Sequence, residues 1–385
     1  MPSDLVIRRV EGARARKRFA HLPWRLYRGD AHWAPPLAGA QAKVLAGRTP
    51  FFERAEMSLF LAERGGEALG RIAAIHNRAH NEHYRDTTGF FGFFECDARD
   101  VEAAAGLFDA AEGWLAARGL TTLRGPVSPS MSAECGLLIE GFDRPPMPLM
   151  AYNPPSYPAL FESLGLRKCK DLYAYLVDAH KLCPGTSAGD RLERLACAIQ
   201  RRNPEITIRS IDMRNYSRDI LLFMSIFDEA RKHNWGYVPS SQKEILYSTT
   251  RLKAVVDPDL IFLAEVAGEP AGAMLAIPNL NRALSAVKGR LFPLGFLRFF
   301  RELERVNEAR VLGVAALPAY RAKGITALLF CEQVRRCLAS GYRWVEASWV
   351  LEDNQMSNES IIGALVPTRY KTYRLYEKPI SPVAG

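Results

Sequence analysis

The sequence predicts an α/β protein whose sheets are mixed, as in the α+β class. Each of its two halves contains one such sheet flanked by helices. The clearest element is a strand, a tight turn and a helix over 311–338, where an apolar run stops at Pro318 and resumes with helical spacing. A hairpin over 260–277 precedes it, and a segment rich in Pro and Gly, 181–190, separates two patterned regions. These observations predict domains at 1–182 and 188–385.

The C-terminal half alternates helices and strands in a regular order. Its hairpin is favoured by two apolar runs around the turn Ala267-Gly-Glu-Pro270. The elements expected here are a helix at about 188–202, a strand at 206–212, helices at 216–232 and 241–253, hairpin strands at 260–266 and 271–277, the strand, turn and helix over 311–338, a strand at 344–350, a short helix and a closing strand at 370–377.

The N-terminal half repeats this plan with different residues. A hairpin is expected around Gly65-Gly66, and a helix is indicated by Ala103, Leu107, Ala110 and Trp114 at helical spacing. The other expected elements are a strand at 5–10 with a helix after it, hairpin strands at 57–63 and 68–76, a strand at 90–95, a strand at 123–127, and a segment at 157–165 that leads into a strand at 171–177.

Composition and charge narrow the class of protein. Hydrophobic residues make up 48% and charged residues 24%, as in ordinary globular proteins, and the net charge of +9 favours anionic partners. No basic block interleaved with aromatic residues marks a nucleic-acid surface. The N-terminus lacks the apolar core of a signal peptide and no run could span a bilayer, so we expect a cytoplasmic protein, with contact to the inner membrane as an option. The seven cysteines form no Cys-x-x-Cys pair, which favours reduced thiols over zinc ligands.

The turn Arg321-Ala-Lys-Gly324 has the features of an anion site. It leaves backbone N–H groups unpaired at a helix N-terminus, where the positive end of the helix dipole and two basic side chains can hold a phosphate or pyrophosphate. Gly324 allows close approach of the backbone. Neither the Walker lysine pattern nor Gly-x-Gly-x-x-Gly is present. The alternative is an ordinary strand-to-helix turn whose basic residues face water.

This turn resembles the acyl-CoA-binding motif of the GCN5-related N-acyltransferase (GNAT) superfamily, Arg/Gln-x-x-Gly-x-Gly/Ala. Arg321, Gly324 and Thr326 occupy its three positions, and Thr326 departs from the pattern by narrowing the room for pyrophosphate. The resemblance implies mixed, mostly antiparallel sheets and acyl-CoA as donor substrate, with no permanently bound cofactor. It places the donor against Gly313, Val314, Ala315, Arg321, Ala322, Lys323, Gly324, Ile325 and Thr326. The matching loop of the N-terminal half, 96–101, carries acids instead, so we expect that half not to bind CoA.

Segments spread along the N-terminal half extend the resemblance to nearly the whole chain. They are Leu22-Pro-Trp-Arg-Leu-Tyr-Arg-Gly-Asp30, the run 70–82, Gly89-Phe-Phe-Gly-Phe-Phe-Glu95, Glu134-Cys-Gly-Leu-Leu138 and Tyr152-Asn-Pro-Pro-Ser-Tyr157. Together they are similar to a family of bacterial tandem GNAT-like proteins that includes bacterial ceramide synthase. The resemblance implies an N-acyltransferase that joins a fatty acyl group from acyl-CoA to the amine of a lipid, with a sphingoid base as the favoured acceptor. Alternatives are an N-acyl amino acid synthase, a small-amine N-acetyltransferase, or a non-catalytic protein that binds acyl-CoA or membrane.

An insertion at 278–308 stands where the superfamily usually needs only a short turn. Its centre, 288–301, mixes apolar side chains with basic ones, which is typical of segments at a membrane interface. A helix buried between the halves and a lining for an acyl tunnel are alternatives. The apolar residues are Leu291, Phe292, Leu294, Phe296, Leu297, Phe299 and Phe300, and the basic ones are Lys288, Arg290, Arg298 and Arg301.

Acyl transfer to an amine needs a base for the ammonium and an acid for the CoA thiolate. Glu352 follows the strand 344–350 and is our candidate base or amine orienter, and Asn358 resembles the family's Asn at the start of the last helix. Glu352 could instead be an acid that favours a helix dipole. Tyr376 is the candidate acid, although tyrosines in a final strand are more often packing residues.

The only histidine cluster is formed by His76, His80 and His83. On a helix these three would share a face, but their spacing matches no established zinc site, and we expect no bound metal. If this loop covers the acceptor site, His80 is the residue best able to accept an amine proton near neutral pH.

Overall fold

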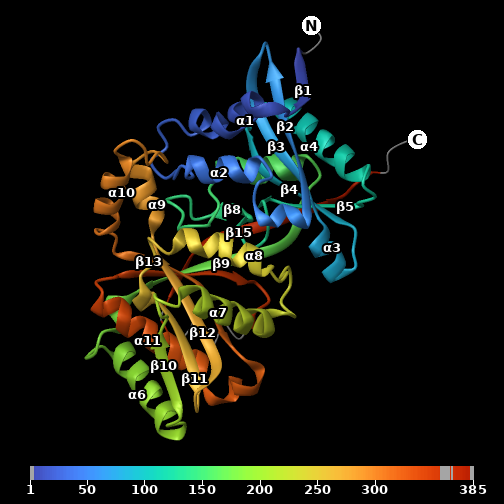
Figure 1. Cartoon of the computed structure of the whole chain (residues 1–385). Coiled ribbons are helices and arrows are strands. Elements are labelled where there is room, and N and C mark those ends of the chain that lie inside the picture. Colours follow the sequence, from blue (N-terminus) through green and yellow to red (C-terminus); the bar gives the residue numbers. More distant parts are fainter. Residues whose placement is uncertain (1–3, 356–364, 366, 382–385) are drawn as a thin grey trace. The chain divides into compact units, whose positions relative to one another are not determined.

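A computed structural model describes residues 4–355, 365 and 367–381 (Figure 1). Its contacts group the chain into two units. Unit 1 contains Met1–Asp171, Leu284–Gly295 and Thr372–Gly385, and unit 2 contains Leu172–Ala283 and Phe296–Lys371. The end of the chain thus belongs with the N-terminal residues. The boundaries 1–182 and 188–385 stay a prediction about domain organisation.

Unit 1 is built on a mixed sheet in the order β1-β2-β3-β4-β5, and β5 pairs with residues 376–379 of β15. Only the pairing of β4 with β5 is parallel in this series. The strands are β1 (Leu5–Arg9), β2 (Ala55–Arg64), β3 (Glu67–Asn77), β4 (Thr88–Cys96), β5 (Thr122–Gly125), β6 (Val127–Ser128), β7 (Glu134–Cys135) and β8 (Leu137–Glu140), and the helices are α1 (Gly12–Leu26), α2 (Ala38–Leu45), α3 (Arg78–Tyr84), α4 (Val101–Ala116) and α5 (Tyr157–Ser163).

The core of unit 1 lies between its sheet and α4. The helix buries Ala103, Leu107 and Ala111, which follow the helical period that predicted it. Phe108 of α4 and Phe91 of β4 meet edge to face with ring centroids 5.0 Å apart. Such aromatic contacts contribute about 0.5–1.5 kcal/mol beyond their buried area, so they help to hold the helix on the strands.

The sheet strands of unit 2 follow the order β9-β14-β13-β12-β11-β10, in which β13 and β14 are parallel. Residues 172–178 of β9 form its edge against β14. The strands are β9 (Arg167–Asp178), β10 (Ile206–Ser210), β11 (Ile261–Val266), β12 (Glu269–Pro278), β13 (Glu308–Ala316) and β14 (Trp344–Leu351), and the helices are α6 (Ser187–Arg202), α7 (Tyr216–Arg231), α8 (Gln242–Leu252), α9 (Leu280–Ala286), α10 (Gly295–Leu303) and α11 (Ile325–Ala339). The strand β15 (Thr368–Pro379) begins in unit 2 and belongs to unit 1 from Thr372 onward.

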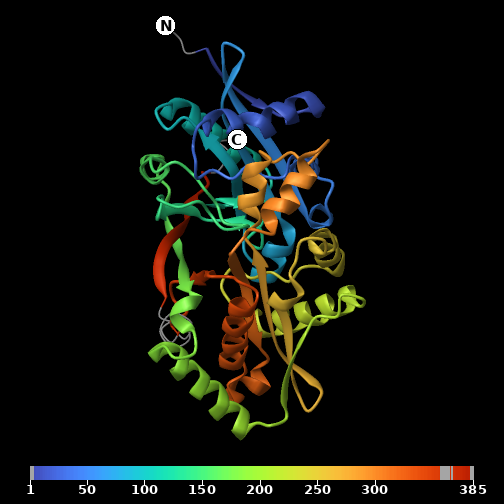
Figure 2. The ribbon, with the colours of Figure 1, turned by 90° about the vertical axis from the view of Figure 1, so that its left-hand side faces the viewer.

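Helices cover both faces of the unit 2 sheet. Phe262 and Ala264 of β11 pack with residues of α11, whereas Leu263 between them packs with Phe223 and Phe227 of α7. Because successive strand residues point to opposite faces, α11 and α7 lie on opposite sides of the sheet. Figure 2 shows this arrangement, with the orange-red α11 and the yellow-green α7 on either side of the strands. The α/β class with mixed sheets is therefore confirmed.

The insertion forms α9 and α10, and within it the chain passes from unit 2 to unit 1 and back, since 284–295 belong to unit 1. Short 3₁₀ turns occur at Pro50–Glu53, Ala179–Leu182, Pro258–Leu260 and Pro318–Lys323. In the part of the chain that the structure describes, no helix has both the length and the apolar character needed to cross a membrane.

A buried charged group stands within the unit 1 core. Glu95 of β4 accepts a hydrogen bond from the hydroxyl of Tyr27 at 2.8 Å, and the hydroxyl of Tyr157 lies 3.2 Å from the same oxygen. The guanidinium of Arg71 lies 3.7 Å from the other oxygen and donates to the carbonyl of Phe19. Burial raises the pKa of Glu95 to about 7 against these opposing contacts.

Replacing Glu95 by Gln tests this burial through pH. The ordinary pKa of a glutamate is 4.5, so between that value and about 7 the folded state holds a proton that the unfolded state has lost. The free energy of unfolding of wild type, relative to E95Q, is therefore expected to fall as the pH rises from about 5 to about 7, by about 3 kcal/mol at most, and then to level off. Urea unfolding of both proteins across this range measures it, and a difference that stays constant contradicts the raised pKa.

Candidate functional site

The parallel strands β13 and β14 part halfway along their length. Their pairing runs from Glu308 opposite Trp344 to Val311 opposite Ala347 and ends there. Beyond Val311, β13 continues to Ala316 while paired with β12 on its other side. The backbone of this stretch therefore has one edge that β14 does not cover, which leaves donors for a ligand. Gly313, Val314 and Ala315 all lie in it.

Gly313 is required by the packing below the parted strand. A Cβ at this position would stand 2.2 Å from the ring of Phe227 on α7. The ring in turn lies under the guanidinium of Arg231, whose centre is 4.4 Å from the ring centroid. Burial lowers the pKa of Arg231 to about 10, which still leaves it charged at neutral pH. The helix can approach the strand this closely only because residue 313 has no side chain.

The turn after β13 presents an open helix N-terminus. Gly324 adopts φ +76° and precedes α11, and no side chain caps the first turn of this helix. The first N–H groups of α11 are thus available to an acceptor from outside, with the positive dipole end behind them. A Cβ at Gly324 would also lie 3.0 Å from Ile199 of α6. Ala322 is exposed, Thr326 is half-buried and Ile325 is buried under the turn.

The two basic side chains of the turn are held on opposite flanks. Arg321 donates to the carbonyl of Ala230 at 3.1 Å, and the ammonium of Lys323 lies 2.7 Å from a carboxylate oxygen of Glu205. This hydrogen bond from Lys323 lowers the pKa of Glu205. Both partners are about one-third exposed, and exposed ion pairs contribute only about 0–1 kcal/mol. Lys323 can therefore exchange Glu205 for a bound phosphate at little cost.

A cluster of buried polar groups lies where the two strands part. Arg310 on β13 donates to the hydroxyl of Ser348 at 2.7 Å and lies 3.5 Å from Glu346, which is fully buried on β14. Ser348 and Tyr370 both donate to the carboxylate of Glu346. No prediction from the sequence included this group. The signal was present, since Arg310 and Glu346 are charged residues inside apolar strand-forming runs.

The candidate catalytic residues fall in different places. Glu352 directly follows β14 in unit 2 and is half-buried, and Asn358 lies outside the described residues. Tyr376 lies in the unit 1 core, with its ring 5.6 Å from that of Phe161 and its hydroxyl 3.4 Å from Glu162. The parted strand and the turn 321–326 share unit 2 with Glu352. The catalytic roles stay predictions.

His80 is buried in unit 1. It lies on α3, its Nε2 is 3.3 Å from a carboxylate oxygen of Asp86, and its ring meets Phe90 edge to face. Burial lowers its pKa, which keeps the ring neutral at pH 7. His83 is on the same helix, whereas His76 is on β3, so the three histidines do not share one helix face.

In unit 1, the positions that correspond to the open strand edge and to the open helix N-terminus of unit 2 contact other groups of the same unit. After the parallel pairs of β4 and β5, a Cβ on Gly92 would stand 1.5 Å from the carbonyl oxygen of Val127, and the N–H of Phe93 donates to the hydroxyl of Ser128 at 3.0 Å. The helix α4 is capped by Asp100, which accepts from the N–H of Ala103. One strand donor and one donor of the helix N-terminus are therefore satisfied within unit 1.

The fold of this chain is similar to that of solved structures. No family model matches the chain. A tandem GNAT protein from the clavulanic acid biosynthesis pathway superimposes with a TM-score of 0.58 at 12% identity, over 98% of this chain and 99% of that one. A GCN5-related N-acetyltransferase from Sphaerobacter thermophilus gives 0.56 at 16% identity, over 99% and 98%. The chain thus has the tandem GNAT fold.

Sequence identity is higher to two named proteins than to these solved structures. Bacterial ceramide synthase of Caulobacter vibrioides is 35% identical over 387 residues, which cover 98% of both chains. Protein YghO of Escherichia coli is 34% identical over 372 residues, which cover 94% of this chain and 93% of YghO. The chain belongs to the family of these two proteins.

Replacing Gly324 by Ala is expected to weaken CoA binding at least about tenfold, because the left-handed conformation costs a residue with a Cβ about 1–2 kcal/mol and the new methyl group crowds Ile199. Calorimetric titration with CoA measures the change. Gly268→Ala is the matched control, since Gly268 has φ +84° in a hairpin turn with open space around it. Equal affinity in G324A and wild type would exclude close backbone approach at this turn.

Replacing Glu346 by Ala should destabilise the chain by about 3–5 kcal/mol, because it leaves the buried charge of Arg310 without its carboxylate. Urea unfolding of E346A beside wild type measures this loss. Glu193→Ala on α6 serves as a control, since Glu193 is exposed. A loss as small as that of the control would show that the buried ion pair does not hold the parted strands.

Proposed function

We propose that this protein is an acyl-CoA-dependent N-acyltransferase that transfers a fatty acyl group to the amine of a lipid, with a sphingoid base as acceptor. The observation that carries the proposal is the uncovered edge of β13 beside the uncapped N-terminus of α11. Its support from relatedness is the 35% identity over nearly full length to a protein named bacterial ceramide synthase.

In this proposal the donor occupies the turn and the strand edge together. The pyrophosphate of acyl-CoA accepts from the first N–H groups of α11, and Arg321 and Lys323 add positive charge after Lys323 leaves Glu205. The thioester then lies along Gly313–Ala315, where backbone N–H groups polarise its carbonyl. The acyl-CoA is consumed as a substrate, and no permanently bound cofactor takes part.

The chemistry needs two proton transfers. The acceptor ammonium loses a proton, its nitrogen attacks the thioester carbon, the C–S bond breaks, and the CoA thiolate takes up a proton. We assign the first transfer to Glu352, as base or as the group that orients the amine, and the second to Tyr376, and Asn358 is a further candidate in the catalytic set. His80 stays a second candidate base for the acceptor ammonium.

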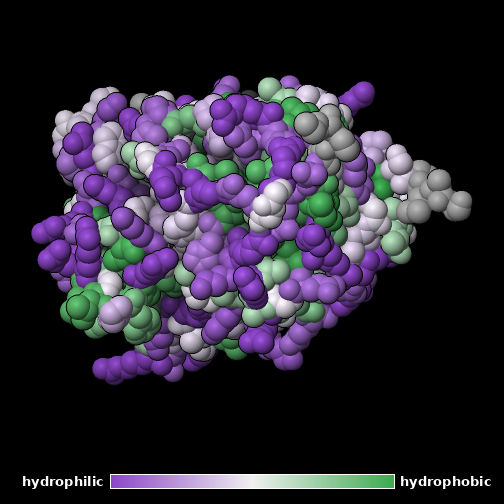
Figure 3. Space-filling model, turned by 90° about the horizontal axis from the view of Figure 1, so that it is seen from above, coloured by the Kyte–Doolittle hydropathy of each residue, from purple (hydrophilic) through white to green (hydrophobic). Residues whose placement is uncertain are grey.

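We also propose contact with an anionic membrane through the segment 288–301. Phe292 is 84% exposed, Leu294 70% and Leu297 60%, whereas Phe299 is buried. Figure 3 shows apolar side chains gathered at the left of this view, the side on which Figure 1 draws α9 and α10. A lipid acceptor has to be drawn from a membrane, which gives this apolar surface a use. The cytoplasmic location stays a prediction.

Thiol release tests the function directly. The purified protein is mixed with acyl-CoAs of increasing chain length and with sphinganine, an amino acid or a small polyamine in detergent micelles. We expect release of free CoA thiol with long-chain donors and sphinganine, and little with the other amines. Release only with acetyl-CoA and small amines would favour a small-amine acetyltransferase, and binding of acyl-CoA without release would favour a non-catalytic protein.

A further inference from the structure

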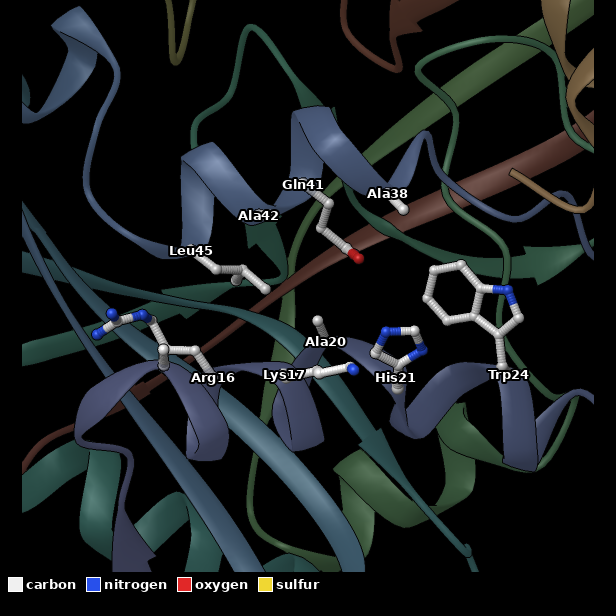
Figure 4. A pocket seen from close by; sticks show the side chains of 10 residues that line it. Arg16, Lys17, Ala20, His21, Trp24, Ala38, Gln41, Ala42 and Leu45 are labelled. Carbon is white, nitrogen blue, oxygen red and sulfur yellow. The ribbon is translucent and has the colours of Figure 1, made fainter. Parts of the chain in front are cut away.

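A small cavity lies between α1 and α2 of unit 1, and none of the residues that line it is assigned to acyl transfer. Its volume is about 210 Å³. One helix contributes Arg16, Lys17, His21 and Trp24, and the other contributes Gln41 and Leu45. Figure 4 shows the polar side chains of Lys17 and His21 and the amide of Gln41 facing the space between the helices.

This cavity concentrates positive charge without an acid to balance it. In the part of the chain that the structure describes, neither Arg16 nor Lys17 forms an ion pair. His21 is half-buried in the same wall. Burial and the charges of Lys17 and Arg290 lower its pKa. Like charges that line one cavity repel each other, so an anion that enters it relieves this repulsion.

The cavity opens beside the exposed apolar turn of the insertion. The N–H of Ala38, a residue that lines the cavity, donates to the carbonyl of Gly289 at 3.3 Å. Arg290 follows Gly289 and acts electrostatically on His21. Two residues further along comes Phe292, and then Leu294, both largely exposed. A cationic cavity and an apolar tip therefore belong to one surface of unit 1.

We propose that the cavity between α1 and α2 binds the phosphate of an anionic phospholipid headgroup while Phe292 and Leu294 enter the bilayer. The proposal rests on the proposed function in one respect, since a lipid acceptor brings the protein to a membrane. A phosphate in the cavity accepts from the ammonium of Lys17 and the amide of Gln41, and Arg16 at the rim adds positive charge. A bilayer is favoured over free phosphate because only a bilayer also covers the apolar tip.

Sedimentation with vesicles tests this inference. Wild type is expected to bind vesicles of phosphatidylcholine with phosphatidylglycerol far better than vesicles of phosphatidylcholine alone. The double variant Arg16→Gln with Lys17→Gln removes two basic groups near the surface and should lose roughly thirtyfold in affinity for the anionic vesicles. The double variant Phe292→Ser with Leu294→Ser should bind neither kind of vesicle. Unchanged binding by the first double variant overturns the proposal.

A matched control comes from α6, where Arg194 and Leu195 are exposed. The double variant Arg194→Gln with Leu195→Ser makes one change of each kind in unit 2 and should bind vesicles like wild type. Loss of binding in this control would mean that net charge alone attracts the membrane, and it would overturn the assignment to the cavity. Circular dichroism of each variant verifies folding.

The result of the vesicle-binding experiment can be distinguished from the result of the thiol-release experiment that tests the acyltransferase proposal. Thiol release in detergent micelles needs no bilayer, so the variant of Arg16 and Lys17 should keep the wild-type rate there. If wild type binds anionic vesicles through the cavity but releases no thiol with any acceptor, the enzymatic proposal fails and the lipid site stands. If thiol is released while the variants bind vesicles like wild type, the lipid site fails alone.

Calorimetry with inorganic phosphate adds a further check, since tight binding of free phosphate with no vesicle binding also overturns the bilayer assignment.

Discussion

The parting of β13 from β14 is the constraint on which the candidate site depends. Two parallel strands that stay paired use their backbone N–H groups on each other and leave none for a ligand. Where the strands separate, the backbone groups along the exposed edge need other hydrogen-bond partners. The separation begins after the pair formed by Val311 and Ala347, and the buried ion pair of Arg310 and Glu346 ties the strands together one position earlier. Buried charges are poor sources of stability but can fix a register, which is the role that suits this pair.

The two units show the same plan used in opposite ways. In unit 2 the strand edge is uncovered and α11 has no side-chain cap, while in unit 1 the hydroxyl of Ser128 occupies the strand donor and Asp100 caps α4. One pattern leaves donors for a ligand and the other satisfies them within the chain. A single repeated fold thus yields one unit suited to a polyphosphate donor and another whose polar groups serve its own stability.

The basic side chains and the exposed apolar side chains suit a substrate that has both an anionic part and a hydrophobic part. At the turn, Lys323 is held by an exposed ion pair that a phosphate can replace. On unit 1, Arg16 and Lys17 line a cavity next to a segment whose Phe292 and Leu294 are exposed. Large exposed apolar side chains are costly in a protein that stays in water, and their pairing with basic groups is typical of a surface that meets lipid.

The sequence by itself determined the α/β class, the repeated plan, and the turn Arg321–Gly324, because hydrophobic period and glycine placement act locally along the chain. It could not show that Arg310 faces Glu346, that His80 is buried against Asp86, or that Arg16 and Lys17 share a cavity, because these contacts join residues far apart in sequence or depend on how helices pack. Nor could it show that the last strand returns to the N-terminal unit. Tertiary structure decided these features, since long-range pairing and burial depend on the whole chain.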